Sequence, residues 1–166
     1  MTERLTELYH QYHASLVRML TRRTGDRDRA EDLAQEVFAR ALESPPNNPR
    51  PWLFAVALNL VRDDGRRAVR QGRRLQLYRE EVPADAPSPD QELERATQVA
   101  AVRAALDSLV SRDREALLLK AEGFDYDEIA ATLGLARGAF GTTLARARRR
   151  LVEAYRAGEK DRHVAS

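Results

Sequence analysis

Apolar residues recur every three or four positions through most of the chain, which is the spacing of amphipathic α-helices. The first stripe of this kind lies within residues 5–20 and the second within 30–42, with a break around Gly25. A loop rich in proline and asparagine follows at 44–49, and Pro51 can open a third helix that continues to about residue 69. Strand signals are nearly absent, so the pattern predicts an all-α protein.

The middle of the chain interrupts this periodicity. Three prolines lie among alanines and acidic residues between 71 and 94, which is the composition of a flexible linker. Helical spacing resumes near Glu92 and continues to the C-terminal residues. We therefore expect two small helical domains, at 1–70 and 95–157, joined by an acidic linker over 71–94 and followed by a frayed tail over 158–166.

Residues 126–145 have the spacing of a helix-turn-helix. Asp125 can cap the first helix together with Glu128, three residues later, and Gly134 supplies the left-handed residue that ends it. A small residue, Ala130, stands where the two helices must touch, and Phe140 stands where the second must dock. The second helix continues into a basic cluster formed by Arg146, Arg148, Arg149 and Arg150. This arrangement is typical of proteins that bind the DNA major groove. The alternative is an ordinary helical hairpin whose arginine face is solvated.

Charge is segregated along the chain rather than large. The formal net charge is +2, from 28 basic and 26 acidic residues, and nearly all of the basic ones are arginine, which suits phosphate and carboxylate contacts. The third helix is apolar in its first half and arginine-rich in its second, with Asn59 at the change. Asn59 can bridge polar groups within the core, or it can read the edge of an unstacked base. In the second case phosphates would be held by Arg62, Arg66 and Arg67.

No catalytic or metal-binding constellation stands out. The chain has no cysteine, and its three histidines lack the spacing of metal ligands, so we expect no enzyme activity, no metal and no cofactor. Asp63 and Asp64 are adjacent and therefore point in different directions on a helix. The N-terminus is too polar for a secretion signal, and the longest apolar run, 52–58, is too short to span a bilayer. These features predict a soluble cytoplasmic protein that does not insert into membranes.

Three stretches occur in an order that resembles a known family. They are AEDLAQEVFARAL at 30–42, PWLFAVALNLVRDDGRR at 51–67 and the helix-turn-helix. Together they resemble the extracytoplasmic-function (ECF) sigma factors of bacterial RNA polymerase. The resemblance implies a sigma region 2-like domain and a region 4-like domain. It also implies a function in transcription initiation: binding core polymerase, recognising the minus-35 and minus-10 promoter elements, and promoting DNA melting.

The resemblance implies a role for three groups of residues. Asp32, Gln35 and Glu36 would dock on the β′ clamp helices of the polymerase. Four residues would contact the minus-10 element and form the pocket for a flipped base there: Asn59, Arg62, Arg66 and Arg67. Five residues would contact the minus-35 element: Arg137, Thr142, Thr143, Arg146 and Arg149. The implied partners are core RNA polymerase, through its β′ clamp helices and β flap, promoter DNA and an anti-sigma factor.

The chain departs from the family in the second helix of the helix-turn-helix. Family members often carry a basic residue where this chain has Gly141 and an arginine where it has Thr143, and a capping serine is common at the position of Ala136. Thr142 and Thr143 can still contact base edges or a thymine methyl group. The promoter sequence therefore does not carry over from relatives.

Two other classes of function compete with this interpretation. A stand-alone helix-turn-helix regulator would bind duplex DNA as a dimer and use the N-terminal half for oligomerisation. Residues 52–67 distinguish the two classes, because a dimerisation helix has no need to run into arginines. An enzyme acting on nucleic acid is a third class, for which the chain offers no candidate nucleophile or metal cluster.

Overall fold

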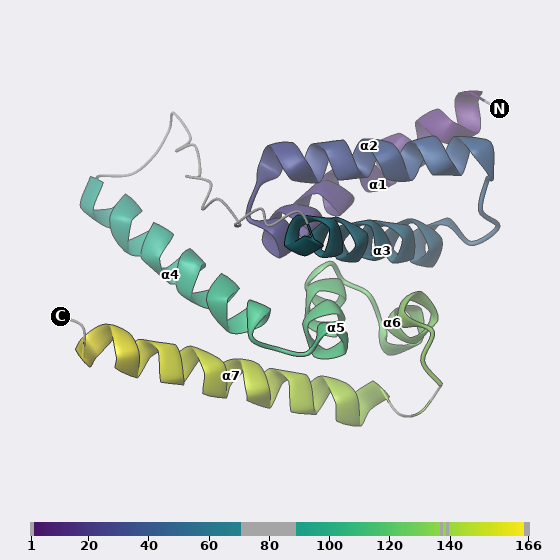
Figure 1. The fold of residues 1–166 in the computed structure, drawn as a ribbon. Coiled ribbons are helices and arrows are strands. Elements are labelled where there is room, and N and C mark those ends of the chain that lie inside the picture. The colour runs from purple at the N-terminus through teal and green to yellow at the C-terminus, as the bar shows by residue number, and fades with distance from the viewer. Residues whose placement is uncertain (1, 71–88, 137, 139, 165–166) are drawn as a thin grey trace.

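The computed structural model describes residues 2–70, 89–136, 138 and 140–164, and for 2, 66–70 and 140 it describes the backbone alone. Within these ranges the protein has seven α-helices and no strand, which confirms the all-α prediction (Figure 1). The N-terminal half contains α1 (Thr2–Thr24), α2 (Arg27–Glu43) and α3 (Pro49–Arg70). The C-terminal half contains α4 (Pro89–Asp107), α5 (Ser111–Ala121), α6 (Tyr126–Leu133) and α7 (Phe140–Val164).

The break between α1 and α2 follows from local backbone chemistry. Gly25 has φ 76°, a left-handed conformation that glycine adopts without a steric penalty. Asp26 then caps α2, because its carboxylate accepts a hydrogen bond from the backbone N–H of Arg29 at 3.2 Å. The turn predicted around Gly25 is thus confirmed, and it lets α2 fold back along α1.

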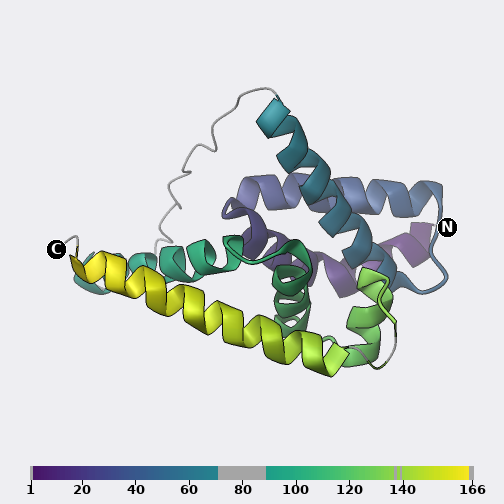
Figure 2. The same cartoon turned by 60° about the horizontal axis from the view of Figure 1, so that its bottom comes forward.

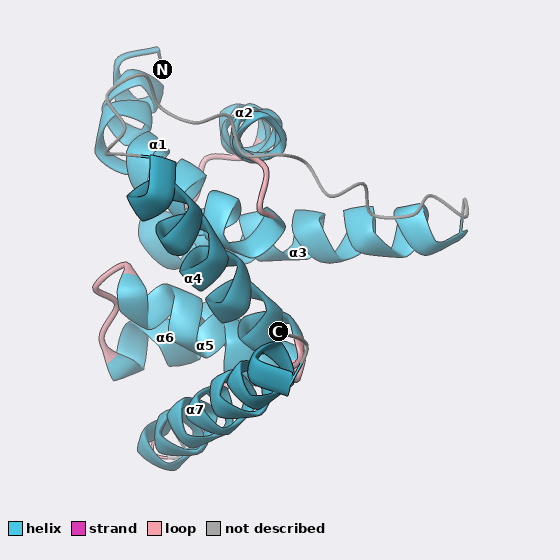
Figure 3. Cartoon of the chain, turned by 90° about the vertical axis from the view of Figure 1, so that its left-hand side faces the viewer, coloured by secondary structure: helices cyan, strands magenta, loops and turns pink. Residues whose placement is uncertain are grey.

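The three N-terminal helices share an apolar core. Helix α2 turns Leu33, Val37 and Phe38 inward, and α3 contributes Leu53 and other buried residues. Helices α2 and α3 cross rather than run parallel, since Figure 3 views α2 nearly end-on while α3 runs across the picture. Leu42 lies outside this core although its spacing placed it on the apolar stripe, because 42% of its surface remains exposed near the end of α2.

Helices α4 and α7 form a long pair in the C-terminal half (Figure 2). Alanines at the buried positions of α4, Ala101 and Ala105, allow the backbones to approach closely. Two expectations need correction here. Helix α4 begins at Pro89, within the stretch assigned to the linker, because proline is well suited to the first turn of a helix. Helix α7 continues to Val164, through most of the predicted tail. Residues 71–88 of the predicted linker lie outside the described part of the chain.

The helix-turn-helix has the predicted local structure. The carboxylate of Asp125 accepts the backbone N–H of Glu128 at 2.8 Å, and the Glu128 carboxylate accepts the backbone N–H of Asp125 at 3.0 Å. This reciprocal capping box satisfies N–H groups that α6 cannot bond internally. Gly134 ends α6 with φ 68°. Ile129 and Ala130 are buried, as their spacing predicted, whereas the side chain of Phe140 lies outside the described atoms.

Asp125→Ala is expected to lower the free energy of unfolding by about 1 kcal/mol, because it removes the acceptor that caps α6. Urea denaturation of the full chain measures this change. The matched control is Asp127→Ala, an exposed acid in the same first turn, which should change stability by less than about 0.5 kcal/mol. Equal losses in the two variants would show that the cap contributes nothing beyond its charge.

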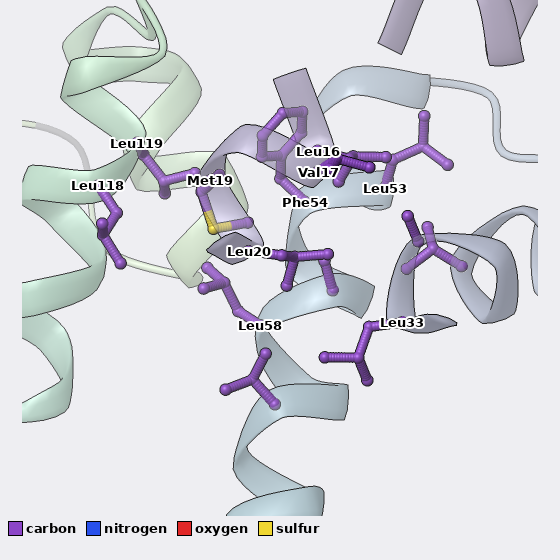
Figure 4. Packing of buried hydrophobic residues seen from close by; sticks show 14 of the residues in the cluster. Leu16, Val17, Met19, Leu20, Leu33, Leu53, Phe54, Leu58, Leu118 and Leu119 are labelled. Atoms are coloured by element: carbon purple, nitrogen blue, oxygen red, sulfur yellow. The ribbon is translucent and has the colours of Figure 1, made fainter. Parts of the chain in front are cut away.

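The two halves share one buried core. Leu118 and Leu119 of α5 approach the apolar residues of α1 and α3, with Leu119 pointing toward Met19 (Figure 4). Helices α5 and α6 pack against α1 and α3, and the rings of Phe54 and Phe124 meet edge to face at 4.7 Å. The apolar packing therefore continues from one half into the other.

Candidate nucleic-acid interface

The residues predicted to dock on polymerase lie together on one face of α2. Asp32, Gln35 and Glu36 are exposed, while Leu33 and Val37 between them are buried. A surface ion pair joins Glu36 of this face to Arg40 at 3.2 Å. The structure therefore presents an accessible acidic patch, made of Asp32, Gln35 and Glu36, on the outer side of the N-terminal half.

Two of the predicted minus-10 residues lie side by side on α3. The Nη1 group of Arg62 donates a hydrogen bond to the side-chain oxygen of Asn59 at 3.2 Å. Both residues line a cavity of about 280 Å³, whose opposite wall is the end of α6, from Ala131 to Gly134. Asn59 is exposed rather than bonded within the core, which leaves its amide accessible from this cavity.

Arg62 is also engaged across the two halves. Its Nε and Nη2 groups donate to the two carboxylate oxygens of Glu115 in α5, at 2.8 and 2.5 Å. The Glu115 side chain is only 2% exposed, and this hydrogen bonding, with the attraction of the carboxylate, raises the pKa of Arg62. Sequence analysis missed Glu115, because nothing in its own helix indicates a partner 53 residues away. The other two predicted minus-10 arginines, Arg66 and Arg67, have side chains outside the described atoms.

Four of the predicted minus-35 residues, Thr142, Thr143, Arg146 and Arg149, lie in the first part of α7. Thr142 and Arg149 are exposed, and Thr143 is half-buried. Arg137 lies outside the described residues. The described members thus form one accessible stretch of the second helix of the helix-turn-helix, which is the part that a DNA groove would meet.

Arg146 and Arg150 share a buried anchor that sequence analysis did not identify. Asp113 at the start of α5 is fully buried, and it accepts from Arg146 at 3.1 Å and from Arg150 at 2.9 Å. The two arginines are four residues apart, so they project from the same side of α7. Asp113 thereby holds both guanidinium groups while about half of each arginine side chain remains exposed, at 43% and 47%.

Other kinds of site find no support in the part of the chain that the structure describes. It contains no group of three or more histidine, cysteine or acidic side chains placed to hold a metal ion. None of its helices combines the length and the apolar character that crossing a membrane requires.

Comparison with known proteins identifies both halves of the chain. Residues 8–71 match the family Sigma-70 region 2, and residues 100–151 match the family Sigma-70, region 4. The chain is 36% identical over 154 residues to the ECF RNA polymerase sigma factor SigE of Mycolicibacterium smegmatis, and the match covers 87% of this chain but 59% of SigE. It is 37% identical to the ECF RNA polymerase sigma factor EcfG of Rhodopseudomonas palustris, with 77% and 72% of the two chains covered.

Solved structures agree with these matches. The sigma factor RpoE of Bartonella quintana, in complex with the anti-sigma factor NepR, superposes with a TM-score of 0.62 at 26% identity, over 93% of this chain and 96% of RpoE. CnrH, in complex with the cytosolic domain of CnrY, shares the fold with a TM-score of 0.67 at 24% identity, over 95% and 90% of the two chains.

The two matched regions occur in one chain in the order region 2, then region 4. A stand-alone helix-turn-helix regulator would account for the second match and leave the first unexplained. Sigma factors are DNA-binding regulators rather than enzymes. The chain therefore belongs to the ECF sigma factors, the promoter-recognising transcription initiation factors of bacterial RNA polymerase.

Proposed function

We propose that this chain binds core RNA polymerase through the acidic patch of α2 and directs it to promoters that α3 opens and α7 recognises. The observation that carries the proposal is the joint match to regions 2 and 4, together with an exposed Asn59 beside Arg62 at a cavity. The proposal places the protein in the cytoplasm, where polymerase acts.

At the minus-10 element, α3 supplies a polar group for a base and cations for the strand. The amide of Asn59 both donates and accepts hydrogen bonds, so it can read the edge of a base that has left the stack. Capture of an unstacked base contributes about 1–3 kcal/mol, which offsets part of the cost of unpairing. The phosphates of that strand are then held by Arg62, Arg66 and Arg67.

At the minus-35 element, the start of α7 enters the major groove. Thr142 and Thr143 contact base edges or a thymine methyl group there, and phosphates or guanines are contacted by Arg137, Arg146 and Arg149. The anchoring of Arg146 by Asp113 supports this role, because a guanidinium that is already oriented loses less conformational entropy on binding. Gly141 and Thr143, which stand where family members often carry basic residues, give this chain its own promoter preference.

Polymerase is engaged at two places, and an anti-sigma factor controls access to it. The β′ clamp helices receive Asp32, Gln35 and Glu36, and the β flap receives the C-terminal half. The similarity to RpoE of Bartonella quintana, solved with the anti-sigma factor NepR, supports an anti-sigma partner for this chain. No bond chemistry is assigned to the protein, since its contribution is sequence-specific binding.

Run-off transcription with purified core polymerase on genomic fragments tests the proposal. We expect transcripts that start at defined promoters only when this protein is present. Absence of any such transcript, together with footprints of the protein alone on palindromic duplex sites, would instead establish a stand-alone regulator.

Arg149→Ala is expected to weaken binding of minus-35 duplex DNA by holoenzyme and to reduce the slope of log K against log salt by about 1, because one phosphate contact is lost. Fluorescence anisotropy at several salt concentrations measures both quantities. The control is Arg156→Ala, a change at an exposed arginine two turns further along α7, which should leave the slope unchanged. An unaltered slope for Arg149→Ala would remove this residue from the phosphate contacts.

A further inference from the structure

Two arginines with little opposite charge around them meet where the end of α1, the end of α4 and the start of α5 come together. The first is Arg114 of α5, which is only 9% exposed. Its Nη2 group donates to the Ser111 hydroxyl at 3.5 Å, a long and weak contact, and its buried Nε group has no hydrogen-bond partner. Among the residues that the structure describes, no carboxylate forms an ion pair with Arg114.

The second arginine is Arg23, at the end of α1. Its side chain is 21% exposed, and its Nη1 group lies 3.8 Å from a carboxylate oxygen of Asp107, too far for a hydrogen bond. Burial, followed by repulsion from Arg114, lowers the pKa of Arg23, while attraction by the carboxylates of Asp107 and Glu115 opposes this change. The Glu115 carboxylate is already bound by Arg62. Two largely buried cations therefore repel each other across this junction.

Two further features of the junction favour an anion. The first turn of α5 leaves backbone N–H groups without partners inside the helix, and its N-cap residue, Val110, forms no side-chain hydrogen bond to them. Arg103 of α4 approaches the same place, since its Nη1 group lies 2.9 Å from the point where a Cβ on Gly25 would stand. Gly25 is two residues after Arg23, so a third guanidinium lies beside the other two.

A buried cation is costly unless an opposite charge pairs with it, so Arg114 is stabilised by an anion that reaches its guanidinium. A guanidinium donates two parallel hydrogen bonds to the oxygens of a phosphate, which suits both Arg23 and Arg114. A phosphate group carries about −1.5 to −2 charges near pH 7, which matches two arginines. The single nearby carboxylate of Asp107 supplies less charge, and its side chain is 53% exposed.

We propose that Arg23 and Arg114 form a binding site for a phosphate group, carried by inorganic phosphate or by a small phosphate ester, at the junction of α1, α4 and α5. The site is separate from the proposed promoter contacts, which include neither arginine. Because both guanidinium groups are largely buried, the site suits a small anion rather than the backbone of a DNA duplex. The bound phosphate accepts hydrogen bonds from both arginines and offsets their repulsion, so it stabilises the folded chain.

Thermal unfolding of the full chain in inorganic phosphate tests the site. With a Kd of about 1 mM, phosphate at about 10 mM should raise the unfolding midpoint by about 3–6 °C relative to chloride at the same ionic strength. Arg114→Met replaces the cation by an uncharged, unbranched side chain and should lose this rise. A rise that persists in Arg114→Met, or no rise in the unmodified chain, would overturn the proposal.

Arg95→Gln is the matched control, because it removes an exposed arginine of α4 about two turns before Arg103. It should keep the full rise in midpoint. Phosphate also stabilises proteins in general through its exclusion from their surfaces, an effect that does not depend on one residue. Equal rises in Arg95→Gln and Arg114→Met would reduce the result to that general effect and reject the site.

Two variants at less buried positions cover the case in which Arg114→Met does not fold. Isothermal titration with inorganic phosphate should show about tenfold weaker binding for Arg23→Gln, because one of the two charged donors is lost. It should show about threefold tighter binding for Asp107→Asn, because a competing carboxylate is removed. A purely structural role of Arg23 predicts neither change, and an unaltered Kd in both variants contradicts the proposal.

The same titration identifies the source of the phosphate group. Inorganic phosphate and adenosine monophosphate serve as the two probes, and the tighter ligand shows whether the site takes the free anion or a small ester. Either result agrees with the proposal, provided that Arg23→Gln weakens it. Displacement of phosphate from the site by a DNA duplex of arbitrary sequence would assign Arg23 and Arg114 to DNA and overturn the proposal.

Discussion

Phe124→Ala is expected to lower the free energy of unfolding by about 3–5 kcal/mol, the range observed when a buried phenylalanine is truncated and leaves a cavity. Phe124 is fully buried between α5 and α6. Its ring meets Phe54 of α3 at 4.7 Å and lies beneath the guanidinium of Arg50 at 4.1 Å. The truncation removes contacts within the C-terminal half and across the interface with the N-terminal half.

Chemical denaturation followed by two probes tests this expectation. The single tryptophan, Trp52, reports on the N-terminal half, and circular dichroism reports on all helices. Because Phe124 packs on Phe54, both transitions should move to lower denaturant. Leu42→Ala, at a side chain 42% exposed, should cost less than about 1 kcal/mol. A Trp52 transition that does not move would show that Phe124 stabilises only its own half.

Asp32→Lys combined with Glu36→Lys is expected to weaken binding to core polymerase by about a hundredfold, or about 3 kcal/mol. The reason is that reversal of two charges opposes a partner surface complementary to the acidic patch, and like charges brought together at an interface cost several kcal/mol. Both side chains are exposed, and the Glu36–Arg40 surface pair contributes little to stability, so the fold should persist.

Titration of labelled core polymerase with the double variant measures this loss, and circular dichroism confirms that the helices remain. The control is Glu43→Lys, at an exposed acid at the end of the same helix and outside the acidic patch. It should weaken binding by less than about threefold. A comparable loss for Glu43→Lys would point to overall charge rather than to a defined docking face.

Helix positions and several helix ends could be predicted because short-range chemistry decides them. Gly25 and Gly134 adopt left-handed backbone angles, and Asp125 caps the helix that follows it. The acidic patch was predictable for the same reason, since residues 32, 35 and 36 lie on one side of any helix that buries Leu33 and Val37. Each of these features needs only residues within about one helical turn.

The extent of α4 and α7 was less predictable, because packing overrides local composition. Pro89 and its acidic neighbours resemble a linker, yet they begin a helix whose Ala101 and Ala105 pack in the interior. Residues 158–166 were expected to fray because they end the chain, but α7 continues to Val164. It passes through Gly158, and one glycine costs only about 1 kcal/mol within a helix. The guanidinium of Arg162 lies over the ring of Tyr155, a contact that spans this glycine along α7.

The amino-acid pattern alone was enough to establish an all-α chain, a helix-turn-helix with its cap and turn, and the faces that carry Asp32, Asn59 and Arg146. Spacing along one helix tells which residues share a side. It does not tell which other helix lies opposite, because that depends on how the whole core closes. The partners of Arg62 and Arg146 therefore depend on the tertiary structure. Glu115, which binds Arg62, lies 53 residues away in the sequence, and Asp113, which binds Arg146, lies 33 residues away. Only the folded chain shows that the arginine expected on the promoter strand is held by a buried carboxylate of the other half.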